Sequence, residues 1–315
     1  MMTKHNEKPK ATDMDEGMKF RCGFAAIIGR PNVGKSTLLN RIVGQKLTIT
    51  SSRPQTTRHK ILGIKTTPAG QVIYVDTPGL HRAGKSAINR YMNRTAKSTL
   101  RDVDVVLWVI EALRWTDEDQ DILAGLAKST APVILVINKV DKVSDKAELL
   151  PFLEEIAQKR EFTAVIPLSA RGGDNVERLE TVVTNLLPEG TAFFPEDQVT
   201  DRSERFFAAE LLREKLMRRL GEELPYAVTV QIEEFAERNG VLHIHAVIWV
   251  EKESQKAIVI GKGGAVLKEI GRRARISMEQ VFAAKVFLKT WVRVKESWSE
   301  DERLLRQLGY DDRED

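Results

Sequence analysis

The feature that most restricts the fold is a glycine-rich loop, GRPNVGKS, which has the spacing G-x-x-x-x-G-K-S over residues 29–36. An apolar segment precedes this loop and a helical pattern, Thr37–Val43, follows it. Glycines such as Gly29 and Gly34 let backbone N–H groups turn toward phosphate oxygens, and a helix start adds partial positive charge. The loop therefore predicts a phosphate-binding unit in which Lys35 reaches the terminal phosphates and Ser36 offers its hydroxyl to magnesium.

The chain from Phe20 to about Leu187 alternates short apolar strands with helical stretches. Repeated strand–helix units favour an α/β fold with a mostly parallel sheet and helices on both faces. In such sheets ligands bind beyond the carboxyl ends of the strands. The expected strands are Phe24–Ile28, Lys60–Thr66, Gln71–Asp76, Val103–Ile110, Val133–Asn138 and Ala164–Ser169, and the expected helices include Ser86–Leu100, Thr116–Ala127 and Lys146–Lys159.

A second motif, DTPG at residues 76–79, ends an expected strand. Asp76 is placed to hold magnesium through water, and Gly79 can offer its backbone N–H to a terminal phosphate. An Asp-x-x-Gly pattern by itself also marks ordinary turns. Its place some forty residues after the phosphate loop favours the nucleotide-binding interpretation.

A third motif, NKVD at residues 138–141, indicates the base. The Asp141 carboxylate can accept two hydrogen bonds from the N1–H and 2-amino groups of guanine, a donor pair that adenine lacks. Asn138 can tie this loop to the phosphate loop, and the stem of Lys139 can lie along the base plane. Ser169 and Ala170, at the end of the next strand, would bring a backbone N–H to the guanine oxygen.

The polar segment TITSSRPQTTRH, residues 48–59, lies between the first two motifs. A mobile loop here would supply a threonine hydroxyl to magnesium only when the third phosphate is present. The alternative is a plain surface loop. Between the two adjacent threonines we favour Thr57 over Thr56.

A different organisation follows Pro188–Thr200, which reads as a linker. We expect a smaller α+β domain with a helix at Arg202–Leu220 and strands at Tyr226–Phe235 and Val241–Val250, joined by a hairpin turn at Asn239-Gly240. An apolar strand ending at Ile260, a helix opened by glycines, a second helix at about Met278–Leu288 and a last strand near Lys289–Lys295 complete the prediction.

The sequence GKGG at residues 261–264 is a G-x-x-G loop, which can clamp the backbone of about four single-stranded nucleotides. From Gly261 to Lys295 there are nine basic and two acidic residues, although the whole chain carries a net charge of only +4. This concentration of positive charge is typical of a surface that binds nucleic acid. The alternatives are an ordinary glycine turn and a solvated helix face. The RNA-binding candidates are Ile260, Gly261, Lys262, Gly263, Gly264, Lys268, Arg272, Arg273 and Arg275. The apolar residues around the loop could form core, groove lining or both.

Composition excludes several classes of protein. Cys22 is the only cysteine, so the chain can form no internal disulfide, which fits a reducing cytosol. No run of about 18 apolar residues predicts a membrane span. The polar N-terminus lacks a hydrophobic signal core and is expected to be a disordered tail over residues 1–19.

The motifs together resemble the translation-factor-related GTPases, and among them most closely the Era family. The matching residues are GRPNVGKSTLLN at 29–40, SSRPQTTRHKILGI at 51–64, DTPGLH at 76–81, NKVD at 138–141 and PLSA at 167–170. The resemblance implies a P-loop GTPase domain followed by a K-homology RNA-binding domain of the bacterial type. It also implies GTP or GDP and Mg²⁺ as ligands, binding to small-subunit ribosomal RNA near its 3′ end, a role in small-subunit assembly, and peripheral contact with the inner face of the cell membrane.

The position after DTPG differs from many GTPases, which use a glutamine there to orient the attacking water. Here that residue is Leu80, so slow intrinsic hydrolysis is expected. Asn32 matches the phosphate-loop asparagine that related GTPases use to hold potassium. Potassium as an accelerating cation is therefore a hypothesis, and the alternative is that Asn32 only stabilises the loop turn.

The sequence thus predicts a cytoplasmic, monomeric, GTP-hydrolysing switch. We expect the GTPase domain at 20–187, a linker at 188–203, the K-homology domain at 204–298 and a C-terminal tail at 299–315. The alternatives are a constitutive RNA-binding module with a relic GTPase domain, and a tRNA-modification partner, which the absence of a C-terminal cysteine disfavours. The catalytic candidates are Lys35, Thr57, Asp76 and Gly79, the magnesium ligands Ser36, Thr57 and Asp76, and the nucleotide-binding residues Gly29, Asn32, Val33, Gly34, Lys35, Ser36, Thr37, Asp76, Gly79, Asn138, Lys139, Asp141, Ser169 and Ala170.

Overall fold

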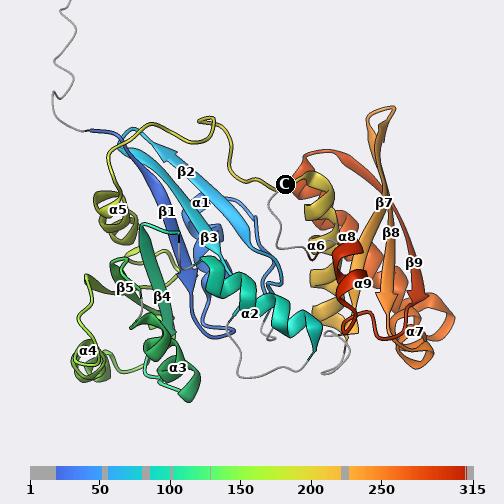
Figure 1. The fold of residues 1–315 in the computed structure, drawn as a ribbon. Helices are drawn as coiled ribbons and strands as arrows, with labels where there is room; N and C mark the ends of the chain where they lie inside the picture. The colour runs from blue at the N-terminus through green and yellow to red at the C-terminus, as the bar shows by residue number, and fades with distance from the viewer. Residues whose placement is uncertain are drawn as a thin grey trace, which may run out of the picture.

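The structure, a computed structural model, describes residues 19–51, 56–79, 86–99, 102–127, 129–220, 227–308 and 310. These residues form two sheets, one of six strands and one of three, which Figure 1 shows side by side with helix α6 (Glu204–Arg219) facing the first unit. Residues 1–18 of the expected N-terminal tail and Leu80 lie outside the described residues. No helix in the described ranges is long and apolar enough to cross a membrane.

The six-stranded sheet has the order β2-β3-β1-β4-β5-β6 and is parallel except for the antiparallel pair β2–β3. Every residue of β5 is buried, and all but the last of β4, because helices cover both faces of the sheet. This confirms the predicted α/β class. The strands are β1 Arg21–Ile28, β2 Ile61–Thr67, β3 Gly70–Asp76, β4 Val105–Glu111, β5 Val133–Asn138 and β6 Ala164–Pro167.

Four helices complete this core. Leu38 and Ile42 of α1 and Leu179 of α5 pack on one face of the sheet, whereas Ile122 of α3 and Ile156 of α4 pack on the other. Thr116 caps α3 through a capping box with Asp119, which fixes where that helix begins. The helices are α1 Lys35–Val43, α3 Asp117–Leu126, α4 Leu149–Ala157 and α5 Val176–Leu186.

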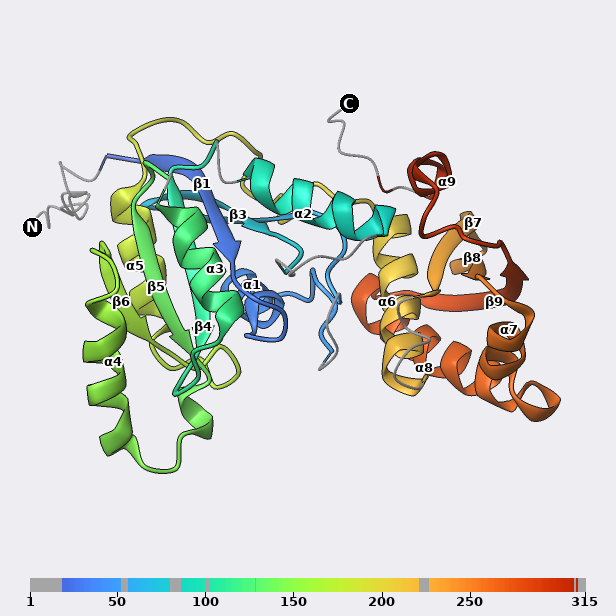
Figure 2. The same ribbon diagram turned by 60° about the horizontal axis from the view of Figure 1, so that its bottom comes forward.

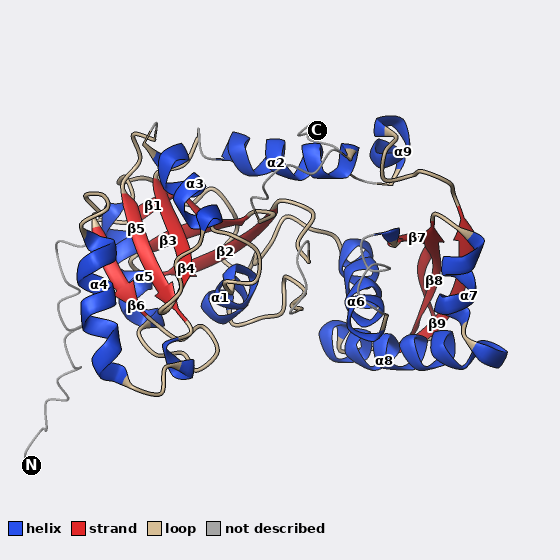
Figure 3. Ribbon diagram, turned by 90° about the horizontal axis from the view of Figure 1, so that it is seen from below, coloured by secondary structure: helices blue, strands red, loops and turns tan. Residues whose placement is uncertain are grey.

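Helix α2 (Ala87–Thr99) packs elsewhere. Its buried side chains Ile88, Tyr91 and Met92 join a cluster with Trp298 and Tyr310 from the end of the chain. Figures 2 and 3 show this helix extending from the six-stranded sheet toward helix α9 (Glu302–Gln307). The helix after DTPG therefore connects the two units instead of covering only the first sheet.

The three-stranded sheet has the order β7-β8-β9, with β7–β8 antiparallel and β8–β9 parallel. Asn239 and Gly240 both have positive φ angles, 51° and 73°, so they form the predicted hairpin turn. Helices α6 and α8 contribute Leu212, Leu216 and Ile270 to the hydrophobic core that they form with this sheet. The elements are β7 Thr229–Arg238, β8 Val241–Val250, α7 Glu253–Ile260, α8 Ala265–Phe282 and β9 Lys285–Val294.

Two predictions in this unit were wrong. The segment before the glycine loop is helix α7 and not a strand, because its inward side chains recur at helical spacing: Gln255 is half-buried and Val259 buried, whereas Ile258 is 54% exposed. No separate helix spans Met278–Leu288. Helix α8 instead ends at Phe282, Ala283 adopts the left-handed conformation with φ 50°, and β9 begins at Lys285.

The expected tail at 299–315 is also wrong for its described part. It contains α9, and the side chain of Tyr310 is 3% exposed. The Tyr310 ring stacks on His59 at a centroid distance of 4.5 Å, and its hydroxyl lies 3.0 Å from Thr229 Oγ1. Tyr310 therefore lies between the two units and contacts both.

We expect Tyr310→Ala to lower the free energy of unfolding by about 3 kcal/mol, because the substitution removes a buried ring and leaves a cavity. Urea unfolding followed by tryptophan fluorescence measures the loss, and Leu150→Ala, at a position 62% exposed, is the control. Equal stability of the two variants would contradict the buried role of Tyr310.

Candidate functional site

The phosphate loop connects β1 to α1 and has tightly constrained glycines. Gly29 has φ 150°, and a Cβ atom there would lie 2.3 Å from the carbonyl oxygen of Val109. Gly34 has φ 106°, and its Cβ would lie 2.2 Å from Asn138 Nδ2. Both positions therefore require glycine for close packing as well as for backbone conformation.

Lys35 begins α1 and points back into the loop. Its Nζ donates hydrogen bonds to the carbonyl oxygens of Gly29 and Arg30, each at 2.9 Å. Burial lowers the pKa of the Lys35 ammonium to about 8, and the nearby carboxylate of Asp76 opposes this shift. A buried ammonium held by the loop is placed to meet phosphate oxygens that enter the loop.

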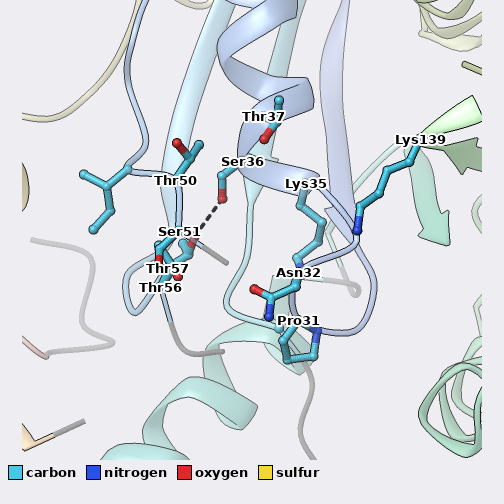
Figure 4. A pocket seen from close by; sticks show the side chains of 13 residues that line it. Pro31, Asn32, Lys35, Ser36, Thr37, Thr50, Ser51, Thr56, Thr57 and Lys139 are labelled. Atoms are coloured by element: carbon cyan, nitrogen blue, oxygen red, sulfur yellow. Dashed lines mark hydrogen bonds between the residues drawn. The ribbon is translucent and has the colours of Figure 1, made fainter. Parts of the chain in front are cut away.

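Three side-chain oxygens converge beside Lys35. Ser36 Oγ lies 2.8 Å from Thr57 Oγ1 and 2.9 Å from Asp76 Oδ2, and Figure 4 shows Ser36 and Thr57 facing each other. Asp76 is fully buried, and within the described residues its Oδ1 has no hydrogen-bond partner. Hydroxyl and carboxylate oxygens are ligands that Mg²⁺ prefers, so this cluster fits the ion. The structure places Thr57, rather than Thr56, in the cluster.

A pocket opens over the loop (Figure 4). Gly79 lies against the loop, since a Cβ atom at this position would come within 3.0 Å of Pro31. Asn32 has a left-handed backbone with φ 64°. The expected residues that line the pocket are Asn32, Gly34, Lys35, Ser36, Thr37, Thr57, Gly79 and Lys139.

The loop after β5 is tied to the phosphate loop. Asn138 Nδ2 donates to the carbonyl oxygen of Val33 at 2.8 Å, and Ser169 Oγ donates to Asp141 Oδ1 at 2.7 Å. The backbone N–H of Ala170, which is expected to reach the guanine oxygen, donates to Asn138 Oδ1 at 2.9 Å.

An ion-pair network that the nucleotide motifs do not predict includes Lys139, which lines the pocket. Arg30, only 5% exposed, bonds Asp119 at 3.1 Å and Glu111 at 3.2 Å, and Lys139 bonds Glu111 at 3.0 Å. The capping box Thr116-x-x-Asp119 was visible in the sequence and could have located the buried carboxylate. No comparable signal identifies Arg30, which occupies a variable position of the loop motif.

The second candidate site is the glycine loop between α7 and α8. A Cβ atom at Gly261 would lie 2.4 Å from Val266 Cγ2, whereas Cβ atoms at Gly263 and Gly264 would meet no atom within 4 Å. All three glycines have positive φ angles. The open side at 263 and 264 leaves room for a sugar–phosphate backbone to approach, and Lys262 is exposed beside it.

A groove continues from this loop between α8 and β9. Lys268, Arg272 and Arg275 line it together with the apolar side chains Leu267 and Leu288. Arg273 does not line the groove, and pairs instead with Glu269 at 2.5 Å. The apolar residues around the loop divide between core and groove lining. Val259 and Ile270 belong to the core, whereas Leu267 packs on the core and also lines the groove.

The Asp76 carboxyl should leave a measurable pH signature. Burial raises its pKa to about 6, although Lys35, Ser36 and Thr57 oppose the rise. The folded protein then binds more protons than the unfolded chain between about pH 4 and pH 6, so Asp76 lowers stability as the pH rises through this window. We expect ligand-free Asp76→Asn to gain up to about 3 kcal/mol relative to the wild type between pH 4 and pH 7.

Urea unfolding at both pH values measures this relative gain. A difference between variant and wild type that does not change with pH would contradict the prediction. In the presence of Mg²⁺ and GDP the wild type should instead be stabilised more than the variant.

The chain matches known proteins over most of its length. A family model described as "50S ribosome-binding GTPase" matches residues 24–139, and one described as "KH domain" matches residues 223–299. GTPase Era of Pseudomonas aeruginosa is 56% identical over 303 residues, which cover 96% of this chain and 99% of that protein. GTPase Era of Azotobacter vinelandii is 57% identical over 299 residues, which cover 95% and 100%.

Two crystal structures of Era also superpose on the fold. Aquifex aeolicus Era bound to GDP·AlF4⁻ gives a TM-score of 0.89 at 39% identity, and covers 92% of this chain and 99% of that one. Era in complex with MgGDPNP and nucleotides 1506–1542 of 16S ribosomal RNA gives a TM-score of 0.89 at 40% identity, with the same coverage. The chain, which joins a P-loop GTPase domain to a K-homology domain, therefore belongs to the Era family of GTPases.

Proposed function

We propose that this GTPase is a molecular switch that binds small-subunit ribosomal RNA near its 3′ end and acts in small-subunit assembly. One observation carries the proposal: the same chain holds the Ser36–Thr57–Asp76 oxygen cluster and a basic groove beside an open G-x-x-G loop. The relative solved with MgGDPNP and 16S ribosomal RNA supports this combination of ligands.

The nucleotide site has a division of roles. Gly29, Val33, Gly34 and Thr37 would place backbone groups around the phosphates, and Lys35 would neutralise charge that develops on the terminal phosphate. Gly79 would donate its backbone N–H to the same phosphate. A magnesium ion held by Ser36, Thr57 and Asp76 would stabilise charge on the phosphate oxygens.

Guanine would be selected beside Lys139. Asp141 retains Oδ2 as an acceptor while Ser169 holds Oδ1, so the carboxylate is oriented for the base edge. Ion pairing with Glu111 holds the Lys139 stem at the pocket edge, where it can lie along the base plane. Because Ala170 is bonded to Asn138, its N–H would reach a guanine oxygen only as a shared donor.

RNA would enter the groove from the glycine loop. Gly261, Gly263 and Gly264 permit close backbone approach, Lys262 supplies charge to phosphate, and Ile260 ends the helix that delivers the loop. Lys268, Arg272 and Arg275 would follow the RNA strand along α8. Arg273 would not belong to this set, because it pairs with Glu269 and does not line the groove.

The cellular setting is part of the same proposal. We propose a monomer in the cytoplasm with peripheral contact at the inner face of the cell membrane, and with the small ribosomal subunit as its partner. The two functional units would be residues 20–187 and 204–298, joined by 188–203. That joining segment packs along the first sheet, where the N–H of Ile64 donates to the carbonyl oxygen of Val199 at 2.9 Å.

We expect RNA from the small-subunit 3′ end to bind more tightly with a non-hydrolysable GTP analogue than with GDP, because the switch couples the two sites. Fluorescence anisotropy at fixed salt measures both affinities, with a scrambled RNA as control. Equal affinities in the two nucleotide states would favour a constitutive RNA-binding module.

Lys268→Ala should weaken RNA binding in both nucleotide states, whereas Arg273→Ala, on the same helix, should change RNA binding little.

We expect GTP hydrolysis to be faster in potassium than in sodium. Asn32 lines the phosphate pocket, where its side chain could help to hold a monovalent cation, and Leu80 cannot replace the missing glutamine. Phosphate release at equal ionic strength compares the two salts. Equal rates would remove potassium from the proposal and leave Asn32 as a residue that stabilises the loop turn.

A further inference from the structure

Thr57, the threonine of the oxygen cluster, is held by the second domain on both sides along the chain. On one side, Arg213 of α6 donates from Nη2 to the carbonyl oxygen of Thr56. On the other side, Nη1 of Arg58 donates to the carbonyl oxygen of Val228 at 2.9 Å and to the Tyr310 hydroxyl at 3.4 Å. Thr57 itself is 8% exposed. Its backbone position therefore depends on groups that belong to the other domain.

The Arg213 guanidinium is itself fixed before it reaches Thr56. Its Nε and Nη2 bond the two carboxylate oxygens of Glu210 at 2.7 Å and 2.6 Å, and its side chain is 1% exposed. A bidentate pair of this kind restricts the direction in which the remaining N–H groups point. The hydrogen bond to Thr56 is therefore directional and comes from a rigid donor.

The same helix also holds the start of the segment. Glu214 Oε1 accepts from the backbone N–H of Thr50 at 3.2 Å, and Nη2 of Arg218 donates to the carbonyl oxygen of Thr50 at 2.8 Å. Glu214, whose side chain is fully buried, binds Lys46 at 2.7 Å as well. Helix α6 thus contacts the chain at both Thr50 and Thr56.

The residue after Arg58 completes the junction. The His59 ring lies between Tyr310, at 4.5 Å and nearly parallel, and Phe206 of α6, at 5.4 Å and nearly perpendicular. A residue two positions from Thr57 is therefore packed between α6 and the C-terminal segment.

We infer that Arg213 and Arg58 are positioning residues that place Thr57 in the oxygen cluster. The inference rests on the proposed function, in which Thr57 reaches magnesium only when the third phosphate is present. Loss of these contacts should therefore penalise the GTP-bound state and spare the GDP-bound state. Coupling of binding energies is reciprocal, so GTP in turn stabilises the packing of α6 against the segment.

The test uses the full chain and a double variant, Glu210→Gln with Arg213→Met. The double change removes the donor to Thr56 together with the carboxylate that pairs with it. Arg219→Met is the matched control, because Arg219 lies on the same helix, is half exposed and pairs with Glu269 within its own domain. Equilibrium affinities for GDP and for a non-hydrolysable GTP analogue are measured in saturating Mg²⁺.

We expect the double variant to bind the GTP analogue about tenfold more weakly and GDP within twofold of the wild type. It should also need more Mg²⁺ for half-maximal binding of the analogue but not of GDP. The control should match the wild type for both nucleotides. Equal losses for GDP and the analogue, or no loss for either, would overturn the inference.

A second variant guards against misfolding of the first. Tyr310→Phe removes one acceptor of Arg58 but keeps the ring that stacks on His59. It should shift the affinity ratio of analogue to GDP in the same direction by a smaller factor, and an unchanged ratio would count against Arg58.

The inference and the proposed function can fail separately. If wild-type RNA affinity is the same with GDP and with the analogue, the switch fails, yet a changed nucleotide ratio in the double variant still supports the positioning of Thr57. If RNA affinity does depend on the nucleotide while the double variant keeps the wild-type ratio, the switch stands and the positioning role is overturned.

Discussion

Parallel pairing of the strands is the constraint on which the nucleotide site depends. In register, Ile27 lies beside Asp76 across β1 and β3, Glu111 beside Asn138 across β4 and β5, and Ile137 beside Pro167 across β5 and β6. Each motif lies at the carboxyl end of its strand, and these ends meet at the same edge of the sheet. Groups from distant parts of the chain therefore come together without long connections. A shift of one residue would move a motif side chain to the opposite face.

This dependence explains why the first domain could be predicted so well. Its strands are short apolar runs that end in recognisable motifs, and β5 begins and ends where the pattern of Val133–Asn138 indicates. The contacts between motifs, such as Asn138 with Val33, follow from sheet order together with the residue types. The contact of Ala170 with Asn138 could not be predicted from the motifs, which indicate the guanine oxygen as the acceptor and not Asn138 Oδ1.

The second domain was predicted less completely because its local signals are ambiguous. Three apolar residues ending at Ile260 fit a strand as well as a helix, and only the packing shows that burial follows the helical spacing of Gln255 and Val259. The end of α8 carries no glycine or proline after Phe282, so Ala283 takes the left-handed conformation without a sequence signal. Tyr310 has no periodic pattern around it, and its burial depends on partners more than two hundred residues away in the first domain, such as His59.

The late position of Tyr310 has a consequence for synthesis of the chain. Domains generally fold as units, the N-terminal one first, so the sheet that carries the phosphate loop can form while α6 and Tyr310 have yet to be made. The surface of α2 that packs against Trp298 stays uncovered during that interval. A growing chain can therefore contain a phosphate loop before the groups that hold Thr57 have been made, and the domain junction is complete only after Tyr310 has been added.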